Sequence, residues 1–296
     1  MKKTIILFAA VAAMISCQKE FNPGSVNQAH EEISFDLGLT TRATAEIFEN
    51  GDKVSIWAVE YTSDEAPELQ AGGNYLNNET LTLDGNRWSA AEKLYWSNSP
   101  CDFYAVYPTI VPTSVESYLF DLVPDQNTPE TANSLSGYEA SDLLFAKAEK
   151  VSRADGKVYL KFAHMMSKCV VNVIKGENFE GYLPNDISVH IYNTVTTADL
   201  NLKNGSVEKY AMGNRKTITM KKLSNDKFEA IVIPQNIERR TPLIEITMGG
   251  IAYLLEYSLS FKPGYIHEIN LTVNTSPDQE KFEIAIDASA GSMNNQ

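Results

Sequence analysis

Short apolar runs that alternate with polar residues recur along the chain after residue 32, and they restrict the fold more than any other feature. Residues 33–44 read ISFDLGLTTRAT and residues 265–273 read YIHEINLTV, so that nearly every second residue is apolar. This period of two is typical of a β-strand with one buried face, because successive side chains point to opposite faces of a sheet. About fifteen such runs follow one another at spacings typical of β-sandwiches. The sequence therefore predicts an all-β protein.

Tight-turn dipeptides separate many of these runs. Asp84-Gly85 and Gly249-Gly250 each lie between two apolar runs, and such dipeptides are typical of β-hairpins because glycine tolerates a positive φ angle. The composition becomes richer in glycine and proline at residues 175–184, where we place a domain boundary. The predicted organisation is a first β-sandwich domain at residues 33–175, a second at residues 176–274, and a C-terminal strand or tail at residues 275–296.

Residues 1–17 read MKKTIILFAAVAAMISC and have the features of an export signal. Lys2 and Lys3 precede an apolar stretch that is too short to span a bilayer as a helix of the mature protein. The serine directly before Cys17 resembles the lipobox of bacterial lipoproteins, in which the cysteine is acylated and becomes the new N-terminus. Two or more acyl chains would anchor the chain stably. The alternative is an ordinary secretory signal with an incidental cysteine. The polar residues 18–32 that follow are typical of a tether.

The charge balance excludes one broad class of partner. The formal net charge is −13, from 38 acidic and 25 basic residues. Binding to nucleic acid requires clustered lysine and arginine side chains, and no such cluster follows residue 3. We therefore expect no nucleic-acid partner.

The residues that usually carry chemistry do not form a recognisable motif. The four histidines of the sequence lack metal-ligand spacing, and there is no nucleophile elbow or phosphate-binding loop. The simplest interpretation of His164, His190 and His267 is that each is a strand or core residue. We therefore expect no enzyme activity, no catalytic residues, no metal and no cofactor.

Two cysteines lie outside the N-terminal segment, namely Cys101 and Cys169. Each lies within an apolar run, which favours buried free thiols. An exported protein could instead oxidise the pair to a disulfide, and the sequence leaves both alternatives open.

Several stretches, taken in order, resemble the fimbrillin family, the subunits of type V pili of Bacteroidales. These stretches are Ser16-Cys17, a strand at residues 33–39 that ends in Thr41-Arg42-Ala43, GDKV at 51–54 before IWA at 56–58, KLYW at 93–96 before DFYAVYP at 102–108, SDLLFA at 141–146 before LKFAHMMSK at 160–168, and FKPGY at 261–265. The resemblance extends over nearly the whole chain. It implies two tandem transthyretin-like β-sandwich domains and a structural or adhesive subunit of a surface pilus.

The resemblance also implies how such a subunit matures. Subunits of this family reach the outer membrane as lipoproteins, here through lipid on Cys17, and an arginine-specific protease then cuts after the arginine that ends the first strand. By position and motif, that bond lies between Arg42 and Ala43. The implied location is the surface of the outer membrane before cleavage and the pilus afterwards. Removal of the strand opens a groove, and a strand from a neighbouring subunit fills it in a head-to-tail polymer. The displaced apolar residues would be Ile33, Phe35, Leu37 and Leu39.

The sequence does not decide which strand this chain would donate. Phe282, Ile284 and Ile286 alternate near the C-terminus and form a candidate donor face, but they suit the last strand of the second domain equally well. Because residues 288–292 provide no aromatic closure for a donor strand, the sequence does not decide between a stalk, a tip and an anchor subunit.

The alternative function is an uncleaved, lipid-anchored surface protein. It would be either a pilus anchor or a module that binds a host glycan or host protein. Exposed aromatic residues such as Trp88 and Trp96 would then form the binding surface, although aromatic residues in strands are more often part of a core.

Overall fold

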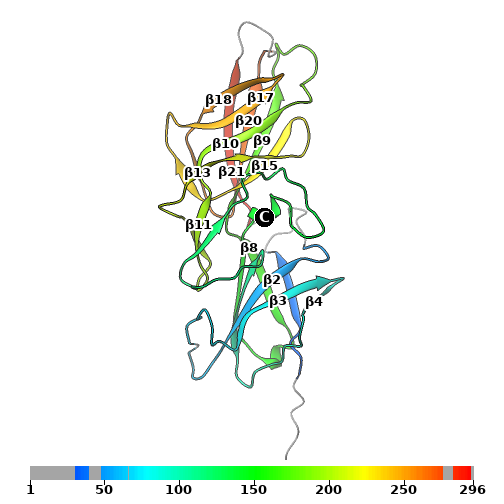
Figure 1. The fold of residues 1–296 in the computed structure, drawn as a ribbon, viewed down its shortest axis with the longest axis vertical. Helices are drawn as coiled ribbons and strands as arrows, with labels where there is room; N and C mark the ends of the chain where they lie inside the picture. The colour runs from blue at the N-terminus through cyan, green and yellow to red at the C-terminus, as the bar shows by residue number, and fades with distance from the viewer. Residues whose placement is uncertain (1–30, 40–47, 66, 276–282, 295–296) are drawn as a thin grey trace, which may run out of the picture. The chain divides into compact units, whose positions relative to one another are not determined.

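The computed structural model describes residues 31–39, 48–65, 67–275 and 283–294. The described residues from Glu32 onwards belong to one compact unit, and Figure 1 shows that it is built from β-strands. The helical elements among the described residues are two short 3-10 turns, η1 (Glu139–Ser141) and η2 (Arg153–Asp155). The prediction of an all-β chain is confirmed.

Strands from the first half of the chain form a closed barrel, in the order β1-β4-β3-β2-β5-β7-β8. These strands are β1 (Phe35–Leu39), β2 (Lys53–Glu60), β3 (Leu76–Asp84), β4 (Arg87–Ala90), β5 (Cys101–Tyr107), β7 (Leu144–Val151) and β8 (Val158–His164). Neighbours around the barrel are antiparallel except β1 and β8, which are parallel. The sheet closes because β1 pairs with both β4 and β8. The tandem transthyretin-like sandwiches stay a prediction.

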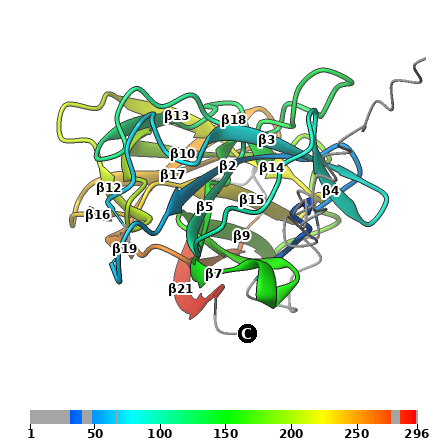
Figure 2. The same ribbon diagram turned by 90° about the horizontal axis from the view of Figure 1, so that it is seen from below.

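Strands β2 and β5, which lie side by side in Figure 2, are buried on both faces. On β2, Val54 and Ile56 belong to the core inside the barrel, whereas Trp57 and Val59 belong to a second core. A strand that is covered on both sides has no polar face, so its sequence is nearly continuously apolar. This double burial explains the runs VSIWAV and CDFYAVY, in which the alternation of polar and apolar residues is weak.

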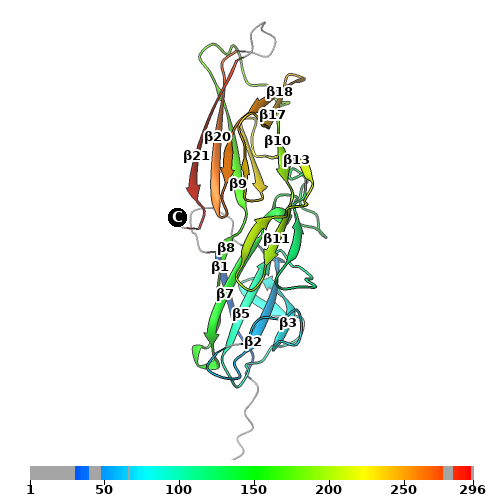
Figure 3. The same cartoon turned by 90° about the vertical axis from the view of Figure 1, so that its left-hand side faces the viewer.

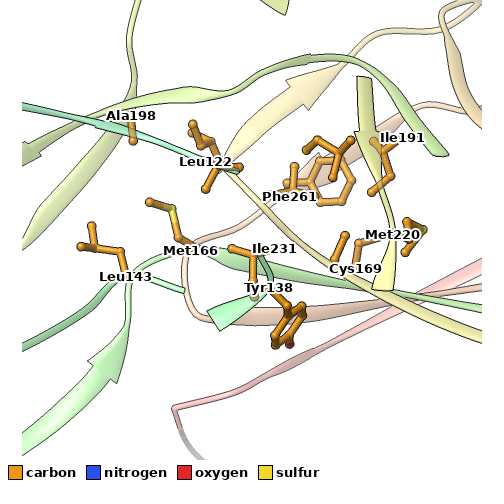
Figure 4. Packing of buried hydrophobic residues seen from close by; sticks show 14 of the residues in the cluster. Leu122, Tyr138, Leu143, Met166, Cys169, Ile191, Ala198, Met220, Ile231 and Phe261 are labelled. Atoms are coloured by element: carbon orange, nitrogen blue, oxygen red, sulfur yellow. The ribbon is translucent and has the colours of Figure 1, made fainter. Parts of the chain in front are cut away.

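The second half of the chain contributes most of two further sheets, whose apolar side chains share the second core. One sheet has the order β13-β10-β17-β18 and the other β14-β15-β9-β20-β21. The strands are β9 (Ser167–Lys175), β10 (Ser188–Val195), β13 (Arg215–Thr219), β14 (Lys221–Lys222), β15 (Lys227–Val232), β17 (Pro242–Met248), β18 (Ile251–Glu256), β20 (Tyr265–Val273) and β21 (Ile284–Ser292). Figure 4 shows part of this core, with Leu122, Met166, Cys169 and Ile231 among the labelled residues.

Two smaller sheets complete the described fold. One consists of β12-β11-β6 and the other of β16-β19. Their strands are β6 (Tyr118–Asp121), β11 (Thr197–Asn201), β12 (Ser206–Lys209), β16 (Gln235–Ile237) and β19 (Leu259–Phe261). The pairing of β6 with β11 joins segments that are about eighty residues apart in the sequence.

The hairpin turns lie where the dipeptides predict them. Strand β3 ends at Asp84 and β4 begins at Arg87, with Gly85 at a φ of 60° between them. Gly249 and Gly250 join β17 to β18 in the same way.

Strand β9 bears on the predicted domain boundary at residue 175. Although β9 follows β8 directly in the sequence, it pairs with β15 and β20 of the second half. Strand β6, which also precedes the boundary, pairs with β11. The limits of the two domains stay a prediction. The pairing of β9 groups it with the later strands β15 and β20.

Candidate functional site

Strand β1 closes the barrel between two strands that do not pair with each other. It runs parallel to β8 from the pair Phe35–Val158 to the pair Leu39–Phe162, and it meets β4 at Trp88. Figure 3 shows β1 beside β8. Without β1, the sheet would have two open edges, one on β4 and one on β8.

Backbone hydrogen bonds hold the segment around β1 on both sides. The Val158 N–H donates to the carbonyl oxygen of Ser34 at 2.9 Å, and the Ile33 N–H donates to the carbonyl oxygen of Leu94 at 2.8 Å. Removal of β1 would therefore leave backbone donors and acceptors of the barrel without partners, which is costly unless water or another strand replaces them.

The apolar side chains of this segment face the barrel core. Ile33 is 6% exposed and Phe35 is 8% exposed, and the Phe35 ring meets the Phe103 ring edge-on with centroids 6.2 Å apart. Leu37 and Leu39 are half-buried and pack against the same core. The four residues of the predicted alternation thus lie on one buried face.

Glu32 adds an ionic attachment that the sequence did not reveal, because the prediction placed it at the end of a polar tether. Its carboxylate lies 2.9 Å from the Arg87 guanidinium and 2.9 Å from the Lys93 ammonium. The hydrogen bond from Lys93 is the main reason that the pKa of Glu32 lies below its usual value. These groups are exposed, so the attachment orients the segment more than it stabilises the fold.

The second candidate element is β21, the C-terminal strand. It pairs antiparallel with β20 along its whole length, from Ile284–Val273 to Ser292–Tyr265, and it forms the edge of its sheet. Ile284 and Ile286 are half-buried and pack against the second core. Each element of the candidate site, β1 and β21, is thus paired within the same chain.

Four of the predicted site residues lie outside the described residues. They are the lipidation site Cys17, the two residues of the cleavage bond, Arg42 and Ala43, and the candidate donor residue Phe282.

A cavity of about 420 Å³ lies at the end of β1, with Leu39 in its wall. The carboxylates of Asp52, Glu139 and Asp142 also line this cavity, together with Lys221. Burial is the main reason that the pKa of Asp52 lies above its usual value. Among the described residues, however, no group of three or more His, Cys, Asp or Glu side chains could hold a metal ion.

The sequence profile of the fimbrillin-like family matches residues 41–288, which is most of the chain. The chain belongs to the fimbrillin-like family. No curated protein matches the chain significantly. Family membership indicates a structural, non-enzymatic protein of the cell surface, associated with fimbriae and with other fimbrial subunits.

Solved structures share the fold of this fimbrillin-like chain. A candidate cell adhesion protein from Bacteroides uniformis is 21% identical with a TM-score of 0.66, and the match covers 88% of this chain and 99% of that one. A second candidate cell adhesion protein, from Bacteroides ovatus, is 14% identical with a TM-score of 0.64, covering 89% and 97% of the two chains. A fimbrial protein from Bacteroides ovatus is 16% identical with a TM-score of 0.53, covering 83% and 50%. At these identities the likeness concerns the fold alone.

Among the described residues of the fimbrillin-like chain, the three histidines lie on three different strands and form no common site. The Nδ1 atom of His164, on β8, lies 2.9 Å from a carboxylate oxygen of Asp142, and both side chains are buried. The Nδ1 atom of His190, on β10, lies 3.5 Å from a carboxylate oxygen of Glu245. Each of these two histidines therefore lies against a carboxylate, and their strands belong to different sheets.

His267 on β20 is buried, and its Nε2 atom accepts a hydrogen bond of 3.0 Å from the Lys262 N–H. Burial, with a smaller effect of the Lys262 charge, lowers the pKa of His267 to about 4 from an ordinary value of 6.5. Between these two pKa values the unfolded chain binds more protons than the folded chain, so stability falls as the pH falls through this window.

We expect the urea midpoint of the wild-type chain to drop on acidification from about pH 7 to about pH 5, with a contribution from His267 of up to about 1.4 kcal/mol per pH unit. In His267→Gln this part of the acid sensitivity should be absent. An equal loss of stability in the variant and the wild type would contradict the assignment.

Both remaining cysteines are free and buried, in agreement with the interpretation that the sequence favours. Burial raises the pKa of the Cys169 thiol to about 12, and burial together with Glu60 raises that of Cys101 to about 11. Neither thiol is therefore reactive at neutral pH.

The alternative in which Trp88 and Trp96 form an exposed binding surface is wrong, and the core position that is commoner for aromatic residues in strands is the one observed. Trp88 is 6% exposed and Trp96 is 8% exposed, and both belong to the barrel core. The Trp88 ring meets the Phe48 ring edge-on, with centroids 5.2 Å apart. Both rings lie inside the barrel and therefore offer no surface for a glycan or host protein.

Among the described residues, no helix has the length and apolar character that a membrane span requires.

Proposed function

We propose that this fimbrillin-like protein is a subunit of a surface fimbria that polymerises by exchanging its first strand for a strand of a neighbouring subunit. The chain is exported as a lipoprotein with acyl chains on Cys17, which hold it at the outer membrane. An arginine-specific protease then cuts between Arg42 and Ala43. The cut separates β1 from the barrel, and the neighbouring subunit supplies the replacement strand.

The position of β1 is the observation that supports this proposal most strongly. A strand that closes a barrel between two non-paired neighbours leaves a groove with two open edges when it departs. Burial of a large apolar side chain contributes about 1.5–3 kcal/mol, so the groove left by Ile33 and Phe35 strongly favours a replacement with alternating apolar residues. Insertion of such a strand restores both the buried surface and the backbone hydrogen bonds.

The proposed cleavage position agrees with two observations. Leu39 is the last residue of β1, and Arg42 follows it after two threonines, so a cut there would release the whole strand. The family profile begins at residue 41, directly after β1. The part of the chain that the profile matches therefore corresponds closely to the part that cleavage would retain.

Strand exchange between neighbours gives a filament rather than a closed oligomer. One subunit supplies a strand and the next supplies the groove, so the two surfaces in contact are different. Contacts of this heterologous kind form open polymers when the rotation between subunits does not close a ring.

We infer that β21 is the donated strand. It is an edge strand with one pairing partner, β20. Its half-buried residues Ile284, Ile286 and Ala288 alternate with exposed residues, as Ile33, Phe35 and Leu37 alternate in the segment of β1. The spacing therefore suits the same groove.

Ile286→Asp tests the donor assignment, with Ala285→Asp as its matched control. Ile286 belongs to the apolar face of β21, whereas Ala285 is exposed on the opposite face. A charge at position 286 would have to enter the apolar groove, so we expect Ile286→Asp to reduce high-molecular-weight polymers at least about tenfold. Ala285→Asp should polymerise normally. Equal polymer yields from both variants, measured on gels of surface-sheared material, would rule out this face of β21 as the donor.

The mature N-terminus tests the proposal against its alternative. In polymers sheared from the cell surface, intact-mass spectrometry should find chains that begin at Ala43. Chains that begin only at the acylated Cys17 would instead support the uncleaved, lipid-anchored protein, with a role as a fimbrial anchor.

A further inference from the structure

The residues that follow β21 fix its C-terminal end at two places, the turn before β20 and the barrel strand β8. The Met293 N–H donates to the carbonyl oxygen of Gly264 at 2.6 Å, and the Met293 side chain is 5% exposed. The Asn294 carboxamide forms two hydrogen bonds with the backbone of His164, accepting from its N–H at 2.9 Å and donating to its carbonyl oxygen at 3.1 Å. We call Met293 and Asn294 the C-terminal latch.

Asn294 of the latch is bonded to β8, the strand that pairs with β1, because His164 is the last residue of β8. Figure 3 shows the C-terminal end of β21 on the side of β8 and β1. The latch is therefore the point at which the candidate donor strand and the acceptor barrel of one chain are joined.

Asn294 also lies on the same edge of β8 as β1. The Val158 N–H faces this edge, since it donates to Ser34. Backbone groups of a strand alternate between its two edges, so every second residue of β8 up to His164 faces the same way as Val158. The last pair between the strands is Leu39–Phe162. The Asn294 carboxamide thus occupies the next position of the ladder, immediately beyond the end of β1.

A carboxamide suits this position because its carbonyl oxygen accepts and its amino group donates, as the carbonyl oxygen and N–H of a peptide unit do. Gly264 leaves the space for it: a Cβ atom at that residue would collide with Asn294 Nδ2, and the φ angle of Gly264 is 67°. Glycine is the residue that tolerates both conditions.

Apart from its ladder with β20, little holds the C-terminal end of β21. The strand pairs on one side only, and its final residues Ala290, Gly291 and Ser292 are small. The buried Met293 is therefore the main apolar anchor at this end. Loss of the latch should loosen β21 more than loss of any exposed residue within the strand.

We propose that the C-terminal latch holds β21 on its own chain, and that a strand entering the groove of β1 releases it. This inference rests on the proposed function, in which the entering strand is β21 of a neighbouring subunit. A strand that extends two residues beyond the position of Leu39 requires the N–H and carbonyl oxygen of His164, so it competes with Asn294. A subunit therefore frees its own donor strand when it accepts one. Free subunits stay inactive as donors, and growth proceeds in one direction.

Hydrogen exchange on the uncleaved full-length chain tests whether the latch holds β21. Asn294→Ala removes both bonds to His164, and a change worth one or two hydrogen bonds corresponds to about tenfold faster exchange of the amides in residues 284–292. Asn236→Ala, which removes a side-chain hydrogen bond to Ser260 at an exposed position, should leave this exchange unchanged. A chain that ends at Ser292 provides a second variant and should show a larger effect. Unchanged exchange of β21 in both latch variants would overturn the proposal.

Two synthetic peptides test the release step on the chain cut after Arg42. Both are taken from the proposed donor strand: one has the sequence of residues 283–290, EIAIDASA, which ends at the position of Leu39, and the other extends it to residue 292, EIAIDASAGS. Only the longer peptide reaches the position of Asn294, so only the longer peptide should accelerate the exchange of β21. Equal effects of the two peptides would contradict competition for His164.

The outcomes separate this proposal from the one on which it rests. If Arg42→Ala leaves polymers intact while Asn294→Ala accelerates exchange in β21, the proposed maturation fails and the latch stands. If Asn294→Ala leaves β21 protected, the latch fails whatever happens at Arg42.

Discussion

Replacement of Arg42 by alanine is expected to abolish high-molecular-weight polymers while the subunit itself accumulates at the cell surface. In the proposed maturation the protease requires an arginine at the bond that it cuts, so the variant keeps β1 covalently attached. A strand that is part of the same chain is present at a very high effective concentration and outcompetes a strand from another subunit. The groove therefore stays filled, and no neighbour can enter it. Gels of unheated surface-sheared material measure the polymers.

Arg239→Ala is the matched control for this experiment. Arg239 is an exposed arginine that lies near the end of β16, far from β1 in the sequence. We expect its variant to polymerise like the wild type. Normal polymers in Arg42→Ala, together with a mature chain that still begins at Cys17, would show that assembly does not depend on cleavage at this residue.

A chain that begins at Ala43 is expected to be much less stable than one that retains β1. Ile33 and Phe35 are almost fully buried, and their loss alone removes about 3–6 kcal/mol of apolar burial. The groove also exposes unpaired backbone groups of β4 and β8. Urea unfolding followed by tryptophan fluorescence should therefore show a clearly lower midpoint, because Trp57, Trp88 and Trp96 are all buried.

A peptide with the sequence of residues 32–39 should restore the stability of this shortened chain. A ligand that binds only the folded state stabilises it in proportion to the logarithm of its concentration. The same peptide with aspartate in place of Phe35 should not restore stability, since it would carry a charge into the barrel core. Identical unfolding curves with and without residues 32–39 would show that β1 is not an integral strand of the barrel.

Local sequence patterns were sufficient to predict many of the strands and turns. The alternation of Ile33, Phe35, Leu37 and Leu39 placed these residues on one face, and the structure places them on the barrel core. Asp84-Gly85 and Gly249-Gly250 lie in the hairpins that they predicted. Such features depend on neighbours within a few residues, so the information is present in each short stretch.

Features that depend on distant pairing were not predictable in the same way. The closure of the barrel requires β1 to meet β8, and β9 joins sheets of the second half. The sequence of a strand does not specify which other strand it pairs with, because any alternating run can pair with another.

The C-terminal latch was missed for a different reason. Residues 291–296 read GSMNNQ, a composition that is typical of a tail. The role of Asn294 depends on two backbone groups of His164, which lies 130 residues away. The one local signal is Gly264 after Pro263, which marks a turn but does not indicate which side chain lies against it.

A photo-crosslinker in place of Tyr159 tests the central claim most directly. Tyr159 lies on β8 opposite Asp36 of β1, and its side chain is 57% exposed, so p-benzoylphenylalanine should be tolerated there. In the uncleaved subunit, irradiation should join position 159 to residues 33–39 of the same chain. In polymers, the account predicts that position 159 crosslinks to residues 283–292 of a different chain. Crosslinks in the polymer that still join position 159 to residues 33–39 would contradict strand exchange.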